Sequence, residues 1–285
     1  MSNLLQRIIT GVLGAAFMLT AIWFGFYSFA AVFFLITVLS SYEYHQLLTK
    51  TGIPNNATAG ITGSIIVYTL FVLHALHFNM SAILVAVPCL LCMVYMLIEL
   101  FSTNEQPLTR IAYTIFGIMY ISIPFGLLTL IPWNYSSTGC VKWEITTSLV
   151  YQFEIIFSIL FLIWANDIGA YFVGKSFGKH KLFERISPKK TWEGSIGGLV
   201  TAMIFTYLLY YFYGIYTIPV WMGLCVIVVI SGSLGDLVES MIKRTLQVKD
   251  SGTLLPGHGG FLDRFDALIF AIPFVYLYLT LINNL

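Results

Sequence analysis

The residues of this chain that could carry out chemistry are concentrated in one polar stretch near its end, from Ser240 to Asp266. This stretch contains four Lys or Arg residues, three aspartates, a histidine and four glycines. Glycine lets a backbone approach an anion closely, and Lys and Arg neutralise phosphate charge. Carboxylates beside such cations are typical of sites that hold a metal ion together with phosphates. We therefore predict a site that binds phosphate groups and a metal ion.

A second group of polar residues precedes this stretch at helical spacing. In a helix, Ser233, Asp236, Ser240 and Lys243 would share one face, and Glu239 would lie one turn before Lys243. An acid followed by a base suits a metal–phosphate site, and it also makes an ordinary salt bridge on a helix surface. Because Asp236 ends an otherwise apolar segment, where a charge is costly, we favour the functional interpretation.

Two stretches further upstream are candidates for the same site. Asp167 lies beside an apolar segment and would share a helix face with Tyr171, although interfacial water alone could also accommodate this carboxylate. The glycine- and lysine-rich stretches 174–181 and 187–194 suit phosphate binding. The alternative for both is an ordinary cytoplasmic loop attracted to anionic lipid.

Asp263 and Asp266 follow a glycine-rich run, at a spacing that projects both from neighbouring positions of one helix. Helix capping would explain one carboxylate, but not a second one together with His258 and Arg264. Oxygen ligands without a Cys or His cluster favour Mg²⁺, which binds one or two carboxylates plus substrate phosphates. The pattern thus indicates phosphoryl or nucleotidyl transfer assisted by Mg²⁺.

The composition requires that membrane helices position these residues. Of the 285 residues, 58% are hydrophobic and 9% are charged, whereas soluble domains have about 25% charged residues. The basic residues lie in short loops between apolar runs, so we predict no nucleic-acid partner. Cys89 and Cys92 form a C-x-x-C pair inside an apolar run, without a second pair. We expect them to be small buried side chains and not a metal or redox site.

The hydrophobic pattern predicts an all-α polytopic membrane protein with about nine transmembrane helices, each near the ~20 residues that cross a bilayer. The predicted spans are Ile8–Phe24, Tyr27–Ser41, Gly60–Phe78, Ser81–Leu100, Arg110–Ile131, Ser148–Asp167, Ser195–Tyr213, Ile218–Leu237 and Phe265–Ile282. A cytoplasmic N-terminus puts all 14 Lys and Arg residues except Lys142 on the cytoplasmic side. The predicted site then lies at the cytoplasmic interface.

The spans divide the chain into two regions. Residues 1–145 form an N-terminal transmembrane region of about five spans, with packing and lipid-facing roles. Residues 146–285 form a C-terminal catalytic region with two cytoplasmic loops, at about 174–194 and 238–264.

At this point the motifs resemble those of a known family. The pattern Ser240-x-x-Lys243-Arg244-(x4)-Lys249-Asp250-x-Gly252-x-x-Leu255-Pro256-x-His258-Gly259-Gly260-x-x-Asp263-Arg264-x-Asp266 resembles the signature of the bacterial phosphatidate cytidylyltransferases, or CDP-diacylglycerol synthases. Three upstream segments are also similar to that family: Asn166–Tyr171, Gly174–Gly178 and Ser187–Gly194. The first five spans match it only in hydrophobic character and length.

The resemblance implies the reaction CTP + phosphatidate → CDP-diacylglycerol + diphosphate, carried out by a multi-pass protein of the cell (inner) membrane. It implies Mg²⁺ with K⁺ as a second cation, membrane lipid as surroundings and a homodimer. The catalytic residues are then Asp236, Asp263, Lys243 and Arg264, and the metal ligands are Asp236, Asp263, Asp266 and Asp167. The substrate-binding residues are Lys175, Lys190, Ser240, Arg244, Lys249, Gly257, His258, Gly259 and Gly260.

Three alternatives stay open at the level of sequence. One is another membrane nucleotidyl- or phosphotransferase that acts on a lipid phosphate. A second is a transporter with intramembrane aspartates along an ion path, although transporters usually place such groups near the midplane and contain repeats, and no repeat is evident here. The third is a scaffold without activity, which would not require a constellation of carboxylates and lysines.

Overall fold

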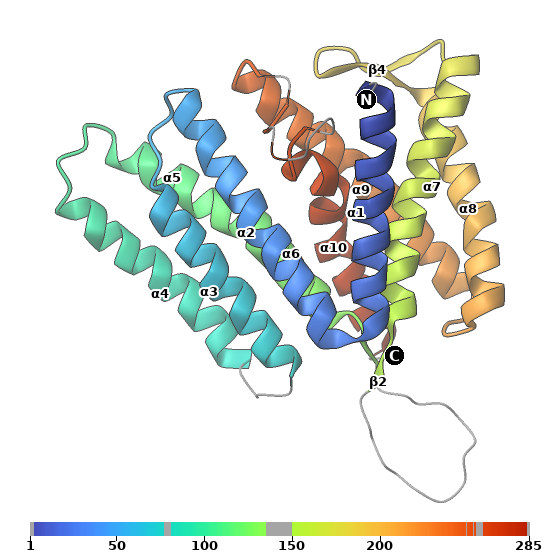
Figure 1. Cartoon of the computed structure of the whole chain (residues 1–285), viewed down its shortest axis with the longest axis horizontal. Helices are drawn as coiled ribbons and strands as arrows, with labels where there is room; N and C mark the ends of the chain where they lie inside the picture. The colour runs from blue at the N-terminus through green and yellow to red at the C-terminus, as the bar shows by residue number, and fades with distance from the viewer. Residues whose placement is uncertain are drawn as a thin grey trace, which may run out of the picture.

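The computed structural model describes residues 3–76, 81–134, 150–248, 250–252, 254 and 259–283. Within this part the chain is a bundle of long helices with two short two-stranded ladders (Figure 1), which confirms the all-α class. The helices are α1 (Asn3–Phe24), α2 (Phe26–Lys50), α3 (Ala57–Ala75), α4 (Ser81–Leu100), α5 (Pro107–Gly117), the π-helical η1 (Ile118–Ser122), α6 (Ile123–Leu130), α7 (Phe153–Phe177), α8 (Trp192–Tyr213), α9 (Ile218–Thr245) and α10 (Leu262–Asn283). The strands are β1 (Trp133–Asn134), β2 (Val150–Tyr151), β3 (Lys181–Phe183) and β4 (Ser187–Thr191).

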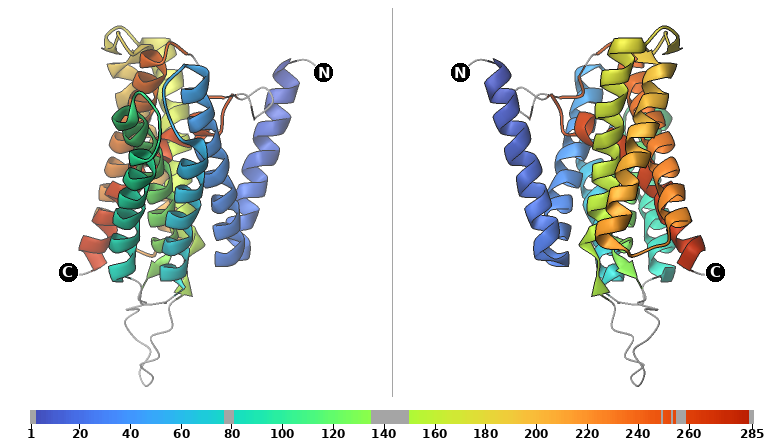
Figure 2. Two further views of the ribbon diagram at one scale, coloured as in Figure 1. Left: turned by 90° about the vertical axis from the view of Figure 1, so that its left-hand side faces the viewer. Right: turned by 90° about the vertical axis from the view of Figure 1, so that its right-hand side faces the viewer.

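Eight helices in the described residues are long and apolar enough to cross a membrane, which confirms a polytopic membrane protein. One of them is the predicted fifth span, in which α5, η1 and α6 continue without a break from Pro107 to Leu130. The first predicted span coincides with α1, whose apolar part Ile9–Phe24 is shorter than the other eight. The start of α1 and the end of α10 lie at opposite ends of the bundle (Figures 1 and 2).

Several predicted helix ends are wrong near the candidate site. The sixth span does not end at Asp167, because α7 continues to Phe177. Gly174, which the pattern assigns to a loop, is therefore helical. It and Gly169 lie where α7 packs on α8: a Cβ on Gly169 would overlap the side chain of Thr201. Residues 178–191 then form the β3–β4 hairpin, which the sequence pattern did not predict, with Lys181 paired to Thr191.

The second predicted loop is also shorter than expected. α9 continues past Leu237 to Thr245, and α10 begins at Leu262 rather than at Phe265. Asp236 and Asp263 are therefore both helical residues. α2 likewise extends to Lys50, well beyond the predicted end of its span.

α9 and α10 pack closely where they carry the predicted carboxylates. A Cβ on Gly235 would lie 2.6 Å from the Phe270 Cβ and 2.7 Å from the Asp266 carbonyl oxygen, so this approach of the two backbones requires glycine. Asp236, the next residue, is thereby brought beside Asp266. The packing of two membrane helices on a small residue is what places acids from both helices in one site.

Gly235→Ala is expected to destabilise the protein by about 1–3 kcal/mol, because an extra methyl group forces two backbones apart. Gly232 provides a matched control on the same helix, since a Cβ there would be 3.5 Å from the Ala267 Cβ, an ordinary contact. Alanine is also the better helix former, so Gly232→Ala should be neutral or slightly stabilising. Thermal unfolding of both variants in one detergent tests this, and equal melting temperatures would contradict it.

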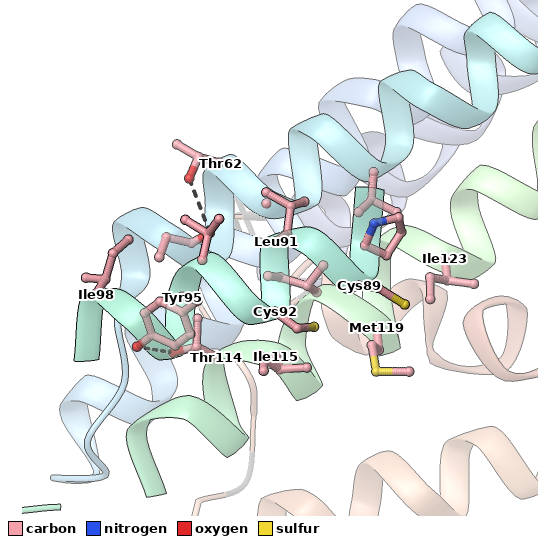
Figure 3. Close-up of a pocket in the computed structure, with 16 residues that line it drawn as sticks. Thr62, Cys89, Leu91, Cys92, Tyr95, Ile98, Thr114, Ile115, Met119 and Ile123 are labelled. Carbon is pink, nitrogen blue, oxygen red and sulfur yellow. Dashed lines mark hydrogen bonds between the residues drawn. The ribbon is translucent and has the colours of Figure 1, made fainter. Parts of the chain in front are cut away.

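An apolar pocket of about 320 Å³ lies apart from this region, between α3, α4 and the α5–α6 helix (Figure 3). Cys89 and Cys92 of α4 line it. Cys92 is half-buried but Cys89 is exposed, so the predicted burial is wrong for Cys89. The reason is that α4 packs along one side only and leaves most of its surface uncovered.

Candidate active site

A cavity of about 380 Å³ is lined by residues of α7, β4, α8, α9 and α10. The β3–β4 hairpin, to which β4 belongs, lies at one end of the bundle (Figure 1). Three predicted carboxylates line the cavity, Asp167 from α7, Asp236 from α9 and Asp266 from α10. Lys175 from the last turn of α7 and two lysines of β4, Lys189 and Lys190, also line it. The fold therefore gathers residues from three separate parts of the sequence, as the prediction of one common site requires.

One ion pair closes the wall of the cavity between the hairpin and α9. Lys190 Nζ lies 2.5 Å from Asp236 Oδ2, and the Ser240 hydroxyl donates to Asp236 Oδ1 at 3.3 Å. In the part of the chain that the structure describes, neither Asp167 nor Asp266 forms an ion pair with Lys or Arg. The cavity thus combines a lysine that can bind phosphate with two carboxylates that have no cationic partner there.

A second charged cluster lies next to the cavity. Lys243 Nζ is 3.1 Å from Glu239 Oε2 and 2.7 Å from Asp263 Oδ1, which confirms the predicted pair one helical turn apart. The buried Glu239 carboxyl group also interacts with that of Asp266, and this contact connects the cluster to the cavity lining.

Asp263 contacts both Lys243 and the loop that precedes α10. Its Oδ2 accepts hydrogen bonds from the backbone N–H groups of Ser251 and Gly260, both at 3.0 Å. Both oxygens of Asp263 are therefore bound by the chain itself. Its proposed role as a metal ligand stays a prediction, while its contacts here orient Lys243 and the loop backbone.

The remaining predicted residues fall into three groups. Arg244 and Arg264 are exposed, and neither lines the cavity. Gly259 and Gly260 lie just before α10 and do not line the cavity either. Lys249, Gly257 and His258 lie outside the described residues. The phosphate-binding roles of all seven residues stay predictions.

Glu193 fixes the hairpin that carries Lys190. Its carboxylate accepts from the backbone N–H groups of Lys179 and His180 at 3.1 and 3.2 Å, and His180 Nδ1 lies 2.6 Å from Glu193 Oε1. The Thr191 hydroxyl caps α8 by accepting from the Gly194 N–H at 3.2 Å. These contacts fix the start of the hairpin relative to α8. They thereby help to keep Lys190 in the lining of the cavity.

Sequence reasoning left some cavity residues out of the predicted site. Asn166, Ser233 and Lys189 also line the cavity, and the Asn166 amide donates to the Ser233 hydroxyl at 3.5 Å. Their polar side chains beside apolar segments were a usable signal. Glu43 of α2, which contacts the loop before α10, was missed altogether.

Comparison with known proteins identifies the family to which this arrangement belongs. The profile of the cytidylyltransferase family matches residues 5–282. The chain belongs to the cytidylyltransferase family. This cytidylyltransferase is accordingly an enzyme that transfers a nucleotidyl group, and the alternatives of a transporter and of a scaffold are not supported.

Curated relatives of this cytidylyltransferase carry a common name. The phosphatidate cytidylyltransferase of Bacillus subtilis (strain 168) is 34% identical over 99% of the chain and 100% of the relative. The phosphatidate cytidylyltransferase of Haemophilus influenzae is 41% identical over 54% of the chain and 55% of the relative. The protein of that name from Staphylococcus aureus (strain COL) is 50% identical over 42% of the chain and 46% of the relative. The family resemblance predicted from the motifs is confirmed.

Proposed function

We propose that this chain is a phosphatidate cytidylyltransferase, which converts CTP and phosphatidate into CDP-diacylglycerol and diphosphate. The observation that supports this most directly is the cavity with Lys175, Lys190 and three carboxylates at one end of an apolar bundle. A water-soluble nucleotide and a lipid phosphate can both reach such a place. The names of the relatives support the choice of substrates.

In the proposed reaction, an ionised oxygen of the lipid phosphate attacks the α-phosphorus of CTP. A new P–O bond forms there, and the bond from the α-phosphorus to the oxygen that bridges to the β-phosphorus breaks. Diphosphate leaves with that electron pair. Because the nucleophile is already ionised, no general base is required, and the chain contributes positioning and charge neutralisation.

The lysines of the site suit this task. Lys190 can bind a substrate phosphate in place of Asp236, since a phosphate offers the same charge-assisted contacts. Lys243 is held at the neighbouring position by Glu239 and Asp263. We assign Arg244 and Arg264 to the triphosphate and the leaving diphosphate, as the motif resemblance implies.

The acidic residues suit a hard divalent cation such as Mg²⁺. Asp167 and Asp266 form no ion pair with Lys or Arg in the described part of the chain, and Asp236 lines the same cavity. No group of three or more His, Cys, Asp or Glu side chains at ligating distances occurs in the described residues. A cation held by one or two carboxylates and by substrate phosphates, whose charge it would neutralise when bound, does not require such a group. K⁺ as a second cation rests on the resemblance alone.

We place the protein in the cell (inner) membrane, with the N-terminus and the site on the cytoplasmic side. The support is the distribution of Lys and Arg, together with the hairpin and the start of α1 lying at the same end of the bundle (Figure 1). The homodimer and the division into residues 1–145 and 146–285 also stay proposals.

The proposed function is tested with purified protein in mixed micelles, labelled CTP, Mg²⁺ and phosphatidate. We expect a lipid-linked CDP product and an equal amount of diphosphate. A parallel reaction with a polyprenyl phosphate as acceptor tests the runner-up, a transferase for another lipid phosphate. Product with that acceptor only, or no product with either, would contradict the proposal.

Lys190→Gln is expected to raise the KM for an anionic substrate by about tenfold or more, because a charge-assisted phosphate contact is lost. Lys181→Gln is the matched control, since it removes the same charge from an exposed position of the same hairpin that does not line the cavity. Initial rates over a range of each substrate concentration make the measurement. Equal effects of the two substitutions would show that only the overall charge of the hairpin matters.

A further inference from the structure

The feature that the proposed chemistry leaves unexplained is a buried acid in the first half of the chain. Glu43 of α2 is fully buried. Its Oε2 accepts a hydrogen bond from the backbone N–H of Leu262 at 3.1 Å. Leu262 is the first residue of α10 and immediately precedes Asp263. A side chain of the second helix therefore holds the start of the last helix.

This contact is a helix cap supplied from another helix. The first backbone N–H groups of a helix have no partner within it, and a buried one requires an acceptor from elsewhere. An acidic group is the favoured acceptor there, because the N-terminal end of a helix is partially positive. Glu43 thus fixes the first turn of α10, which contains Asp263.

The same carboxyl group also supports the loop before α10. A Cβ on Gly252 would overlap Glu43 Oε1, and one on Gly260 would lie 2.6 Å from Oε2. Both glycines are therefore needed for the loop backbone to pass this close to the acid. The backbones of Leu254 and Phe261 also interact with it.

From the other side, Asp263 binds the same loop through the N–H groups of Ser251 and Gly260. Two carboxylates from different helices thus hold one short segment between them. Only one of the two, Asp263, also contacts Lys243.

We propose that Glu43 is a positioning residue for the transfer reaction: it fixes the start of α10 and the backbone at Gly252 and Gly260, so that Asp263 presents Lys243 beside the cavity. Glu43 does not line the cavity itself and acts through Asp263. The inference rests on the proposed function for its kinetic readout, but its structural readout is independent of it.

The experiment compares Glu43→Ala and Glu43→Gln with the wild-type enzyme. Glu43→Ala is expected to lower kcat by about 10- to 100-fold, because small misplacements of reacting groups have effects of this size. Glu43→Gln should recover most of this loss, because its amide oxygen can still accept from Leu262. Glu99→Gln is the matched control: Glu99 is also a buried acid of the first half, paired with Arg110 at 3.2 Å, and it forms no hydrogen bond or ion pair with the described residues of the loop. Its kcat per folded molecule should remain at the wild-type value.

The second readout is amide hydrogen exchange of the intact enzyme. Peptides covering 250–263 should exchange about tenfold faster in Glu43→Ala, while those of the hairpin 178–191 stay unchanged. If the loop exchanges faster but kcat does not fall, or if Glu43→Gln is as impaired as Glu43→Ala, the positioning role is wrong. If the wild-type enzyme makes no product, the proposed function fails, and exchange alone decides whether Glu43 holds the loop.

Gly252→Ala keeps the proposal testable if Glu43→Ala does not accumulate as a folded protein. Its methyl group displaces the Glu43 carboxyl group from Leu262 without removing the acid. The expected result is again a lower kcat and faster exchange at 250–263. Wild-type values for both would overturn the proposal.

Discussion

Asp263→Asn is expected to lower kcat by about 100- to 1,000-fold, the size of effect that follows when one preorganised charged group is removed from an active site. The substitution replaces one carboxylate oxygen by an amide NH₂ group, which cannot accept a hydrogen bond. Either Lys243 loses its partner at 2.7 Å, or the loop loses the acceptor for the N–H groups of Ser251 and Gly260. Initial rates with CTP and phosphatidate, per amount of folded protein, make the measurement.

Glu99→Gln again provides the control for the loss of a buried carboxylate. It breaks an ion pair with Arg110 and should lower the melting temperature, since one partner of a buried pair is left uncompensated. Turnover by the molecules that remain folded should not change. If Asp263→Asn had no larger effect on turnover than Glu99→Gln, the assignment of Asp263 to the catalytic machinery would be wrong.

Removal of divalent cations is expected to abolish turnover, with a loss of about 1,000-fold or more, because charge neutralisation supplies most of the catalysis of phosphoryl-group transfer. Treatment with a chelator followed by addition of excess Mg²⁺ should restore the rate. Activity that a chelator leaves unchanged would contradict a role for Asp167, Asp236 and Asp266 in holding a cation.

His258→Ala is the informative comparison for the chelation experiment. The nucleophile is an ionised phosphate oxygen, so no histidine is needed to remove a proton. We expect a loss of about tenfold at most, well below the range of general-base catalysis that reaches 10⁴-fold. A loss in kcat from His258→Ala as large as that from chelation would contradict a mechanism without a general base.

The part of the site that follows from local periodicity could be predicted from the sequence. Ser240, Glu239 and Lys243 make the contacts that helical spacing requires, with the carboxylates of Asp236 and Asp263 as partners. The helical character of the long apolar segments also follows from hydrophobicity, because in lipid the backbone must satisfy its own hydrogen bonds. Eight of the nine predicted spans are long and apolar enough to cross a membrane in the described residues, and the apolar part of the first is shorter.

What depends on a distant partner could not be predicted. Gly174 of α7 resembles a loop residue until Gly194 of α8 is known to pack beside it. The pairing of Lys190 with Asp236 depends on a hairpin whose strands have little apolar alternation. Glu43 and Leu262 are 219 residues apart, and nothing near either residue indicates the other. The only sequence feature that marks Glu43 is that an acidic residue directly follows an apolar segment, where a charge is costly.

The hydrogen bond between Glu43 and Leu262 has a consequence for how the protein is made. Its acceptor is synthesised with the second helix, and its donor with the last. The ribosome has therefore translated nearly the whole chain, and the membrane has received the other helices, before the two groups can meet. Contacts of such separation form late in folding. A nascent chain that lacks α10 would contain most of the cavity wall yet remain inactive, so that turnover begins only once the final helix has been inserted.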